Sequence, residues 1–564
     1  MCDAMSADLL IRLRQIVGEN HVLTEAAQTR RYREGYRFGS GEALAVVRPA
    51  TLVEYWHVLQ ACAAADVVII NQAANTGLTG GSTPSGGYGR AVVIIHTMRI
   101  KGIQLINDNR QAVCLPAATL HELESLLKPL GREPHSVIGS SCIGASVIGG
   151  VCNNSGGALV QRGPAYTEMA LYAQIDASGT LNLVNHLGID LGDSPEEILD
   201  NLQNGRYQRK DIAAGTHGHD HAYCQHVRQI DADTPARFNA DPSRLHQASG
   251  SAGRLAVFAV RLDTFPAAEQ TAVFYIGSAH TATLTRLRRE MLSNFANLPV
   301  SGEYIHRDAF DLAEQYGKDM FYVIKHFGTQ HLPNLFAAKA AVDRFAARMP
   351  FLPRHFADRA LQTLSRLLPA HLPPRLTDFR HRYEHHLILK TADAGIAETR
   401  DYLNQLFADP QQGAFFECTP DEAQAAMLHR FAVASAAVRY RAVHPRDTED
   451  IVALDIALRR NDHDWFEQLP PELDAKIARK LYYGHFFCHV FHQDYIVKKG
   501  EDCLAVEHAM WKLLDQRGAH YPAEHNVGHL YPAAPALRDF YRSLDPTNRF
   551  NAGIGQTSKQ KDWQ

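Results

Sequence analysis

Two short segments near the end of the chain gather side chains that can move protons or bind a metal ion. Residues 483–492 and 523–529 together carry His485, His489, His492, Glu524, His525 and His529. A histidine near its ordinary pKa of about 6.5 is the default general base at neutral pH, and a neutral imidazole is a common ligand of divalent metals. The two segments therefore predict one centre for proton transfer or metal binding.

The geometry of the first segment depends on the element that carries it. On a strand, residues seven apart face opposite ways, so His485 and His492 converge only if the chain bends. On a helix, His489 would share a face with His485 or with His492. We expect His489 and His529 to be packing or surface residues, as most of the 30 histidines must be.

A helical segment upstream supplies a candidate clamp for a carboxylate. Residues 428–441 are mostly small and apolar, and they carry Arg430, Arg439 and Arg441. The planar guanidinium group of arginine can bind both oxygens of a carboxylate. A charged side chain on an apolar face needs a partner. Either a carboxylate substrate or a structural salt bridge would meet that need for Arg430.

Two glycine-rich loops have the composition of a dinucleotide cradle. They cover residues 76–87 and 138–157, and each follows an apolar segment. Glycine reaches positive φ and lacks a Cβ, so its amides can converge on a pyrophosphate and its backbone can approach a flat ring. One such loop alone would favour a simple tight turn, whereas two favour a cofactor site. Their spacing disfavours a Rossmann site and excludes a P-loop.

The segments around these loops alternate between short strands and helices. Helical spacing is expected over residues 7–35 and 52–65, and residues 204–225 are expected to form a polar surface loop. Short apolar segments predict strands at 45–48, 67–70, 91–96 and 255–262. This alternation predicts an α+β fold.

A basic segment stands out in a chain whose overall net charge is −4. Residues 320–383 hold ten Lys and Arg against three acids, a net charge of +7, with Phe and Leu interleaved. Such a segment suits adsorption to anionic headgroups, although a solvated cap is the plainer alternative. No recognised nucleic-acid module is present, so we expect no nucleic-acid partner. No apolar run approaches the roughly 20 residues that span a bilayer, so membrane contact would be peripheral.

Several stretches resemble known flavoproteins. Ala73-Ala-Asn-Thr-Gly-Leu-Thr-Gly-Gly-Ser resembles the pyrophosphate loop of FAD-binding domains of the vanillyl-alcohol-oxidase (PCMH) type. Four stretches resemble the quinone-dependent D-lactate dehydrogenases, namely residues 131–157, 161–168, 491–500 and 521–531. The resemblance extends over nearly the whole chain, and the last three stretches are specific to that family.

The resemblance implies a set of FAD contacts. These are Ala73, Ala74, Asn75, Thr76, Gly77, Gly81, Ser82, Gly139, Ser146, Gly156 and Val257. Some relatives attach FAD through a histidine. Neither glycine loop contains one, although His135 precedes the second loop, so we expect non-covalent FAD.

The resemblance also implies roles for the histidine segments. In related D-2-hydroxyacid dehydrogenases a Gly-His-x6-His pair and a later Glu-His pair form the active site, and His485, His492 and the pair Glu524-His525 match them. His525 would be the general base and Arg430 would bind the substrate carboxylate. Whether a divalent metal binds His485, His492 and Glu524 stays open, because the relatives carry Gly-Asp-Gly-Asn between the two histidines and this sequence does not.

The implied function is oxidation of D-lactate to pyruvate by hydride transfer to FAD, with a membrane quinone as acceptor. The implied location is the cytoplasmic face of the cell inner membrane, held peripherally through residues 320–383 on anionic phospholipid. The fold would be α+β, with a two-subdomain PCMH-type FAD-binding domain, an α+β cap and a mostly helical basic insert. Their bounds would be 1–263 completed by 516–564, 264–305 with 384–515, and 306–383.

Two alternatives stay open at this point. One is a D-2-hydroxyglutarate-type dehydrogenase that uses a soluble electron acceptor. The other is a non-catalytic flavin-binding membrane protein.

Overall fold

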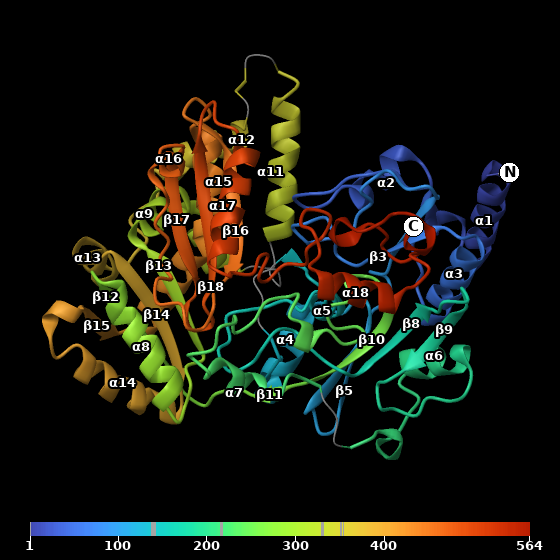
Figure 1. Ribbon diagram of the computed structural model, residues 1–564, viewed down its shortest axis with the longest axis horizontal. Helices are drawn as coiled ribbons and strands as arrows, with labels where there is room; N and C mark the ends of the chain where they lie inside the picture. Colours follow the sequence, from blue (N-terminus) through green and yellow to red (C-terminus); the bar gives the residue numbers. More distant parts are fainter. Residues whose placement is uncertain (1, 137–142, 215–217, 329–331, 350–351, 354) are drawn as a thin grey trace.

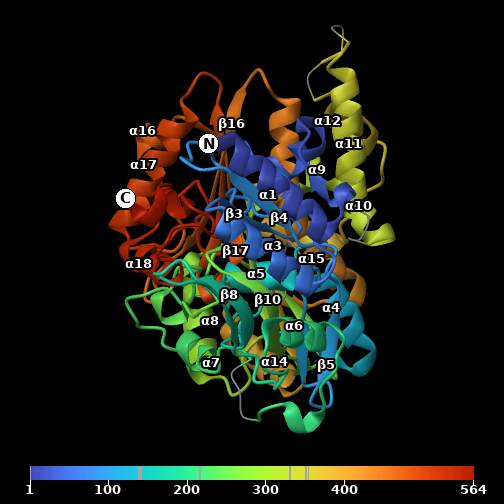
Figure 2. The ribbon, with the colours of Figure 1, turned by 90° about the vertical axis from the view of Figure 1, so that its right-hand side faces the viewer.

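A computed structural model gives the arrangement of the chain for residues 2–136, 143–214, 218–328, 332–349, 352–353 and 355–564. Two halves lie side by side, one carrying both termini and the other built on a large sheet, and α11 rises above them (Figures 1 and 2). The structure is therefore of mixed α+β type, as the sequence predicts.

The first half begins with a four-stranded sheet of order β1-β2-β4-β3. Its strands are β1 (Val22–Leu23), β2 (Ala45–Val47), β3 (Val68–Gln72) and β4 (Val92–His96). Strands β2, β4 and β3 run parallel, and α3 (Leu52–Ala64) connects β2 to β3. The Thr51 hydroxyl caps α3 by accepting from the Glu54 amide, as hydroxyl side chains do at helix starts.

The predicted helix over residues 7–35 is wrong, because the structure divides this stretch. Helix α1 (Cys2–Val17) ends where Gly18 adopts a φ of +86°, a conformation that glycine reaches without strain. Strand β1 follows and pairs with β2, and α2 (Ala26–Arg33) then begins.

A second sheet, of order β5-β6-β10-β8-β9, completes the first half. Its strands are β5 (Ile103–Ile106), β6 (Gln111–Cys114), β8 (Ala170–Ile175), β9 (Leu181–Asn185) and β10 (Ala256–Asp263). Phe258 on β10 packs against Tyr55 and Trp56 of α3, with ring centroids 4.7 and 6.4 Å apart. Helix α3 thus joins the two sheets in one core.

Smaller elements fill this half. They are α4 (Leu120–Leu127), β7 (Arg132–Glu133), α5 (Val147–Cys152), α6 (Pro195–Gln203), α7 (Tyr223–Val227) and β11 (Phe265–Pro266). The C-terminal tail, after α18 (Pro535–Leu544), returns to the first sheet, where the Ile69 amide donates to the Arg549 carbonyl and the Asn551 amide donates to the Ile69 carbonyl. The C-terminal tail therefore packs in the same half of the molecule as the N-terminal strands.

The second half is built on a seven-stranded antiparallel sheet of order β15-β12-β14-β13-β17-β18-β16. Its strands are β12 (Thr271–Ser278), β13 (Ser301–His306), β14 (His385–Ala392), β15 (Ala414–Glu417), β16 (Thr448–Ala457), β17 (Ile477–His485) and β18 (Val490–Lys498). One face packs against α8 (Thr281–Asn294), α14 (Ala394–Leu406) and α17 (Cys503–Gln516). The other packs against α9 (Arg307–Tyr316) and α15 (Pro420–Val443). The short α16 (Pro471–Asp474) precedes β17.

The basic segment forms a helical layer beside this half (Figures 1 and 2). Its helices are α10 (Lys318–Phe327), α11 (Leu332–Ala346), α12 (Phe356–Ser365) and α13 (Pro374–Arg382). Arg354, one of its ten basic residues, lies outside the described residues. Among the helices that the structure describes, none is long and apolar enough to cross a membrane.

Candidate active site

A β-hairpin brings two of the predicted histidines together. Strand β17 ends at His485, a tight turn follows in which His489 has a φ of +52°, and β18 returns with His492 opposite Tyr483. The rings of His485 and His492 lie 5.5 Å apart between centroids. The chain therefore bends, as convergence on a strand required, and the helical alternative is wrong. His489 is buried in the turn, with Nδ1 3.0 Å from the Arg459 carbonyl oxygen.

Two carboxylates hold His485 from opposite sides. Its Nδ1 lies 2.6 Å from Glu303 Oε1 and its Nε2 lies 3.3 Å from Glu524 Oε2. Glu524 Oε2 is also 3.8 Å from His492 Nε2. Glu303 was missed in the sequence, although a single acid within the buried strand β13 was a usable signal.

The charges of this cluster shift its protonation equilibria strongly. Burial opposes ionisation of Glu303 and Glu524, but attraction to His485 outweighs it and lowers the pKa of both carboxyls. Burial also opposes charge on His485, yet the two carboxylates raise its pKa to about 10. For His492 burial dominates and lowers its pKa to about 3. At neutral pH the hairpin thus offers one imidazolium and one neutral imidazole.

His525 lies at the edge of the cluster, with a side chain that is 37% exposed. Its Nε2 is 3.7 Å from Asp455 Oδ2, which also accepts a hydrogen bond from the Glu524 amide at 2.6 Å. Burial raises the pKa of Asp455 to about 6, against the effect of His525. Asp455, on β16, was also missed in the sequence. Of His485, His492 and His525, His525 has the most exposed side chain.

Arg430 reaches the same cluster from α15. Its Nη2 lies 2.9 Å from Glu303 Oε2, and its guanidinium carbon lies 4.5 Å above the Tyr483 ring. Its Nε is buried and has no hydrogen-bond partner among the described residues. The predicted salt bridge therefore exists, and it occupies only part of the guanidinium group.

The segment that carries Glu524 and His525 contacts both glycine loops. Asn526 accepts at its carbonyl from the Thr79 hydroxyl at 2.7 Å, and its side-chain amide donates to Asn153 Oδ1 at 2.8 Å. A Cβ on Gly156 would lie 2.4 Å from Glu524 Oε1, so any larger residue there would displace the Glu524 side chain. Both predicted cofactor loops thus adjoin the histidine cluster.

The first glycine loop has the features of an anion cradle. Asn75 adopts a φ of +54°, and a Cβ on Gly77 would meet nothing within 4 Å. In the described part of the chain, the amides of residues 74–78 have no backbone acceptor. Amides without a backbone acceptor are free to bind a pyrophosphate. The predicted contacts Ala73, Ala74, Asn75, Thr76, Gly77, Gly81 and Ser82 lie on this loop or on the three residues before it. These residues fit FAD.

The remaining predicted FAD contacts are spread over the second sheet and its loop. Ser146 is buried and caps α5 by accepting from the Gly149 amide at 3.0 Å. Val257 is buried on β10, at an irregularity in its pairing with β8. Gly139 lies outside the described residues.

A buried arginine that the sequence did not reveal holds Glu524 against the second glycine loop. Arg237 Nη2 lies 3.0 Å from Glu524 Oε1 and also donates to the Gly157 carbonyl, while Nη1 donates to the Leu159 carbonyl at 3.2 Å. This fully buried cation compensates the charge of Glu524, which would otherwise be costly to bury.

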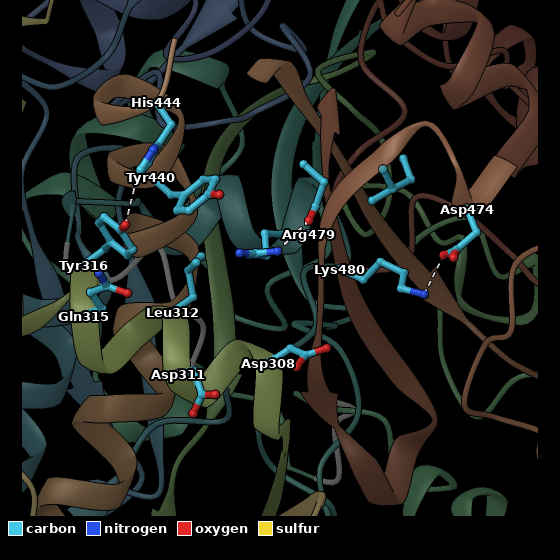
Figure 3. A pocket seen from close by; sticks show the side chains of 12 residues that line it. Asp308, Asp311, Leu312, Gln315, Tyr316, Tyr440, His444, Asp474, Arg479 and Lys480 are labelled. Atoms are coloured by element: carbon cyan, nitrogen blue, oxygen red, sulfur yellow. Dashed lines mark hydrogen bonds and ion pairs between the residues drawn. The ribbon is translucent and has the colours of Figure 1, made fainter. Parts of the chain in front are cut away.

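Two further observations bound the site. His529 is held between the carbonyl oxygens of Gly553 and Thr83, each 3.1 Å from a ring nitrogen, so it packs as expected. A separate cavity of about 590 Å³ lies between α9, the end of α15 and the start of β17 (Figure 3). None of the predicted catalytic residues lines that cavity.

Two family models match the chain. One, described as a D-lactate dehydrogenase, membrane binding, matches residues 273–563, and the other, an FAD binding domain, matches residues 43–182. The first covers more than half of the sequence.

Named relatives match along almost the whole length. A quinone-dependent D-lactate dehydrogenase of Haemophilus influenzae is 65% identical over 98% of this chain and 99% of its own. The chain belongs to the quinone-dependent D-lactate dehydrogenases. Members from Escherichia coli and Corynebacterium glutamicum are 58% and 46% identical, over 98% and 99% of this chain and 97% and 98% of their own.

Solved structures of low identity share the fold. p-Cresol methylhydroxylase with substrate bound has a TM-score of 0.58 at 12% identity, covering 98% of this chain and 97% of its own. Alkyldihydroxyacetonephosphate synthase has a TM-score of 0.57 at 12% identity, covering 97% and 84%. The predicted PCMH-type flavoprotein fold is therefore confirmed.

Proposed function

We propose that the protein oxidises D-lactate to pyruvate, with FAD as the cofactor and a membrane quinone as the electron acceptor. One observation carries this proposal: Asn526, next to the predicted base His525, bonds to both glycine loops. A cofactor held on those loops would adjoin the histidine cluster. The names of the relatives support D-lactate over D-2-hydroxyglutarate and a quinone over a soluble acceptor.

The side chains of the cluster suit three tasks of this oxidation. His525 would take the proton of the substrate hydroxyl, because it is the exposed base of the centre and has Asp455 beside it. Arg430 would bind the substrate carboxylate through N–H groups of its guanidinium that do not contact Glu303. His485 and His492 would face the substrate oxygen from the hairpin.

Cofactor chemistry completes the reaction. FAD, when bound without a covalent link, supplies the acceptor for the hydride that leaves C2 of D-lactate. The nitrogen and carboxylate donors of His485, His492 and Glu524 lie within 4.8 Å of one another, which fits a divalent ion provided that its binding displaces the proton from His485. Such an ion would polarise the substrate hydroxyl.

We further propose that the protein binds peripherally to anionic phospholipid on the cytoplasmic face of the cell inner membrane. Phe327, Phe345, Leu364 and Leu367 are between 59% and 82% exposed on the helical layer. Lys325, Arg344, Arg348 and Arg366 are exposed near them in sequence, and none forms an ion pair within the described chain. Exposed apolar side chains between unpaired cations suit a lipid interface.

The first experiment is anaerobic reduction of the purified flavoprotein. D-lactate, L-lactate and D-2-hydroxyglutarate are added separately while the flavin band near roughly 450 nm is followed. Rapid bleaching by D-lactate alone is the expected result. Bound flavin that no hydroxy acid reduces would exclude the proposed reaction, and a protein without flavin would also exclude the assignment of the glycine loops.

A further inference from the structure

A second group of potential metal ligands lies on the first half of the molecule. Donor atoms of His219, His221 and Asp263 all lie within 4.8 Å of one another. The closest pair is His219 Nδ1 and Asp263 Oδ2, at 2.5 Å, and the two imidazole rings are 3.8 Å apart between centroids. None of these residues takes part in the proposed oxidation.

A close backbone contact between residue 218 and β10 brings His219 and Asp263 together. The Asp263 amide, at the end of β10, donates to the Gly218 carbonyl at 3.1 Å. A Cβ on Gly218 would lie 2.8 Å from both the backbone nitrogen and the side chain of Asp263. Glycine is therefore required at 218, and its close approach to β10 delivers the next residue, His219, to the carboxylate.

A hydrogen bond on its other oxygen also orients the Asp263 carboxylate. The Gln111 amide donates to Asp263 Oδ1 at 2.7 Å, which leaves Oδ2 directed at His219. Arg261 Nε in turn donates to Gln111 Oε1 at 2.9 Å. Metal-binding carboxylates are commonly fixed by an outer layer of hydrogen bonds of this kind.

His135 provides an independent indication of a ligand. Its side chain is buried, and neither ring nitrogen has a hydrogen-bond partner among the described residues. Its ring centroid lies 6.0 Å from that of His219. A buried imidazole with two unused nitrogens is costly unless another ligand engages it.

We propose that His219, His221 and Asp263 bind a divalent transition-metal ion of the zinc type, with His135 as the nearest further donor. Two imidazoles and one carboxylate are a donor set that zinc accepts. The ion would tie residues 218–222 to the end of β10, so it would stabilise this half of the molecule. It takes no part in the oxidation and does not depend on the proposed function.

The test measures zinc bound to the FAD-loaded protein. After chelation, the protein is dialysed against buffered Zn²⁺, and bound metal is counted by mass spectrometry while Tm is recorded. The main variant is His221→Ala, because an exposed histidine can be removed without disturbing the fold. Its control is His121→Ala, an exposed histidine on α4. His492→Ala accounts for any ion held at the active site.

We expect His221→Ala to lose about one zinc per chain, or to bind it about tenfold more weakly or worse, and to lose the zinc-induced rise in Tm. His121→Ala and His492→Ala should keep that ion, and D-lactate should still reduce the flavin of His221→Ala. Asp263→Asn, checked for retained flavin, should repeat the loss. Equal zinc in the wild type, His221→Ala and Asp263→Asn would overturn the proposal.

Discussion

Glu303 links the two ends of the proposed substrate site. One of its oxygens contacts His485 at 2.6 Å and the other contacts Arg430 at 2.9 Å. A single buried carboxylate thus fixes a hairpin histidine and the proposed carboxylate clamp relative to each other. Because His485 and Arg430 are both cations, their charges offset the free-energy cost of burying the Glu303 carboxylate.

Removal of the base should slow the chemical step alone. His525→Ala should lower kcat for D-lactate by about 10²- to 10⁴-fold, the usual contribution of a positioned base. Flavin content should not change, because the contacts of Asn526 with the glycine loops do not involve the His525 side chain. Steady-state kinetics measure this, with the exposed His463→Ala as the control. Normal kcat in His525→Ala would assign the base elsewhere.

Arg430→Lys tests the carboxylate clamp. Lysine keeps the charge but loses the planar fork, and a charge-assisted hydrogen bond is worth about 1.5–3 kcal/mol. We therefore expect kcat/KM for D-lactate to fall about 10- to 150-fold, mainly through KM. Arg441→Lys, on the same helix but paired with Asp450, should leave KM unchanged. A KM shift shared by both variants would point to general damage to α15.

At the scale of elements, the first turn of α15 is held by a cap and an ion pair. Thr419 and Glu422 form a capping box, and Glu422 also binds Arg375 of α13. The Arg375 hydrogen bond, opposed by burial and helped by Thr419, lowers the pKa of Glu422 to about 2. Since the folded pKa lies below the unfolded one, the stabilisation is complete above about pH 4.5 and is lost as pH falls toward 2.

Glu422→Gln should reveal this pH dependence. At pH 7 we expect it to destabilise the protein by about 0.5–1 kcal/mol, the worth of a partly exposed ion pair. The difference from the wild type should shrink as pH falls from about 4.5 toward 2. Urea unfolding at several pH values measures it, and Glu472→Gln, an acid without a described ion pair, is the control. A difference that stays constant with pH would contradict the assignment.

Four strands of the first half were predictable from the sequence, whereas the partners of the site residues were not. Apolar segments placed β2, β3, β4 and β10 within one or two residues, because a buried strand leaves a continuous apolar run. Glu303 and Asp455 were missed because their partners are set by sheet order. Strand β13, which carries Glu303, pairs with β17, which carries His485, although the two residues are 182 positions apart in the sequence. Strand β16, which carries Asp455, pairs with β18.

At the scale of the whole molecule, the helical layer should decide membrane binding without affecting catalysis. Each basic residue near an anionic surface contributes about 1 kcal/mol. The double variant Arg344→Gln, Arg348→Gln should therefore bind anionic vesicles about 30-fold more weakly.

Vesicle co-sedimentation measures this binding. Binding of the wild type should weaken with added salt, and neutral vesicles should show no difference between the proteins. Lys512→Gln, an exposed cation on α17, is the matched control and should bind as the wild type does. Unchanged binding of the double variant would move the lipid contact to another surface. Flavin reduction by D-lactate should be the same in all three proteins.

The return of the C-terminal tail to Ile69 has a consequence for how the protein is made. Asn551 also donates to the carbonyl oxygens of Gly81 and Ala252, so the last residues fasten the first glycine loop. A ribosome delivers the chain from its N-terminus. The first half is therefore completed only after the seven-stranded sheet of the second half has left the ribosome. The first glycine loop is therefore fastened only once Asn551 has been synthesised, so a chain that stalls before that residue should not hold the cofactor stably.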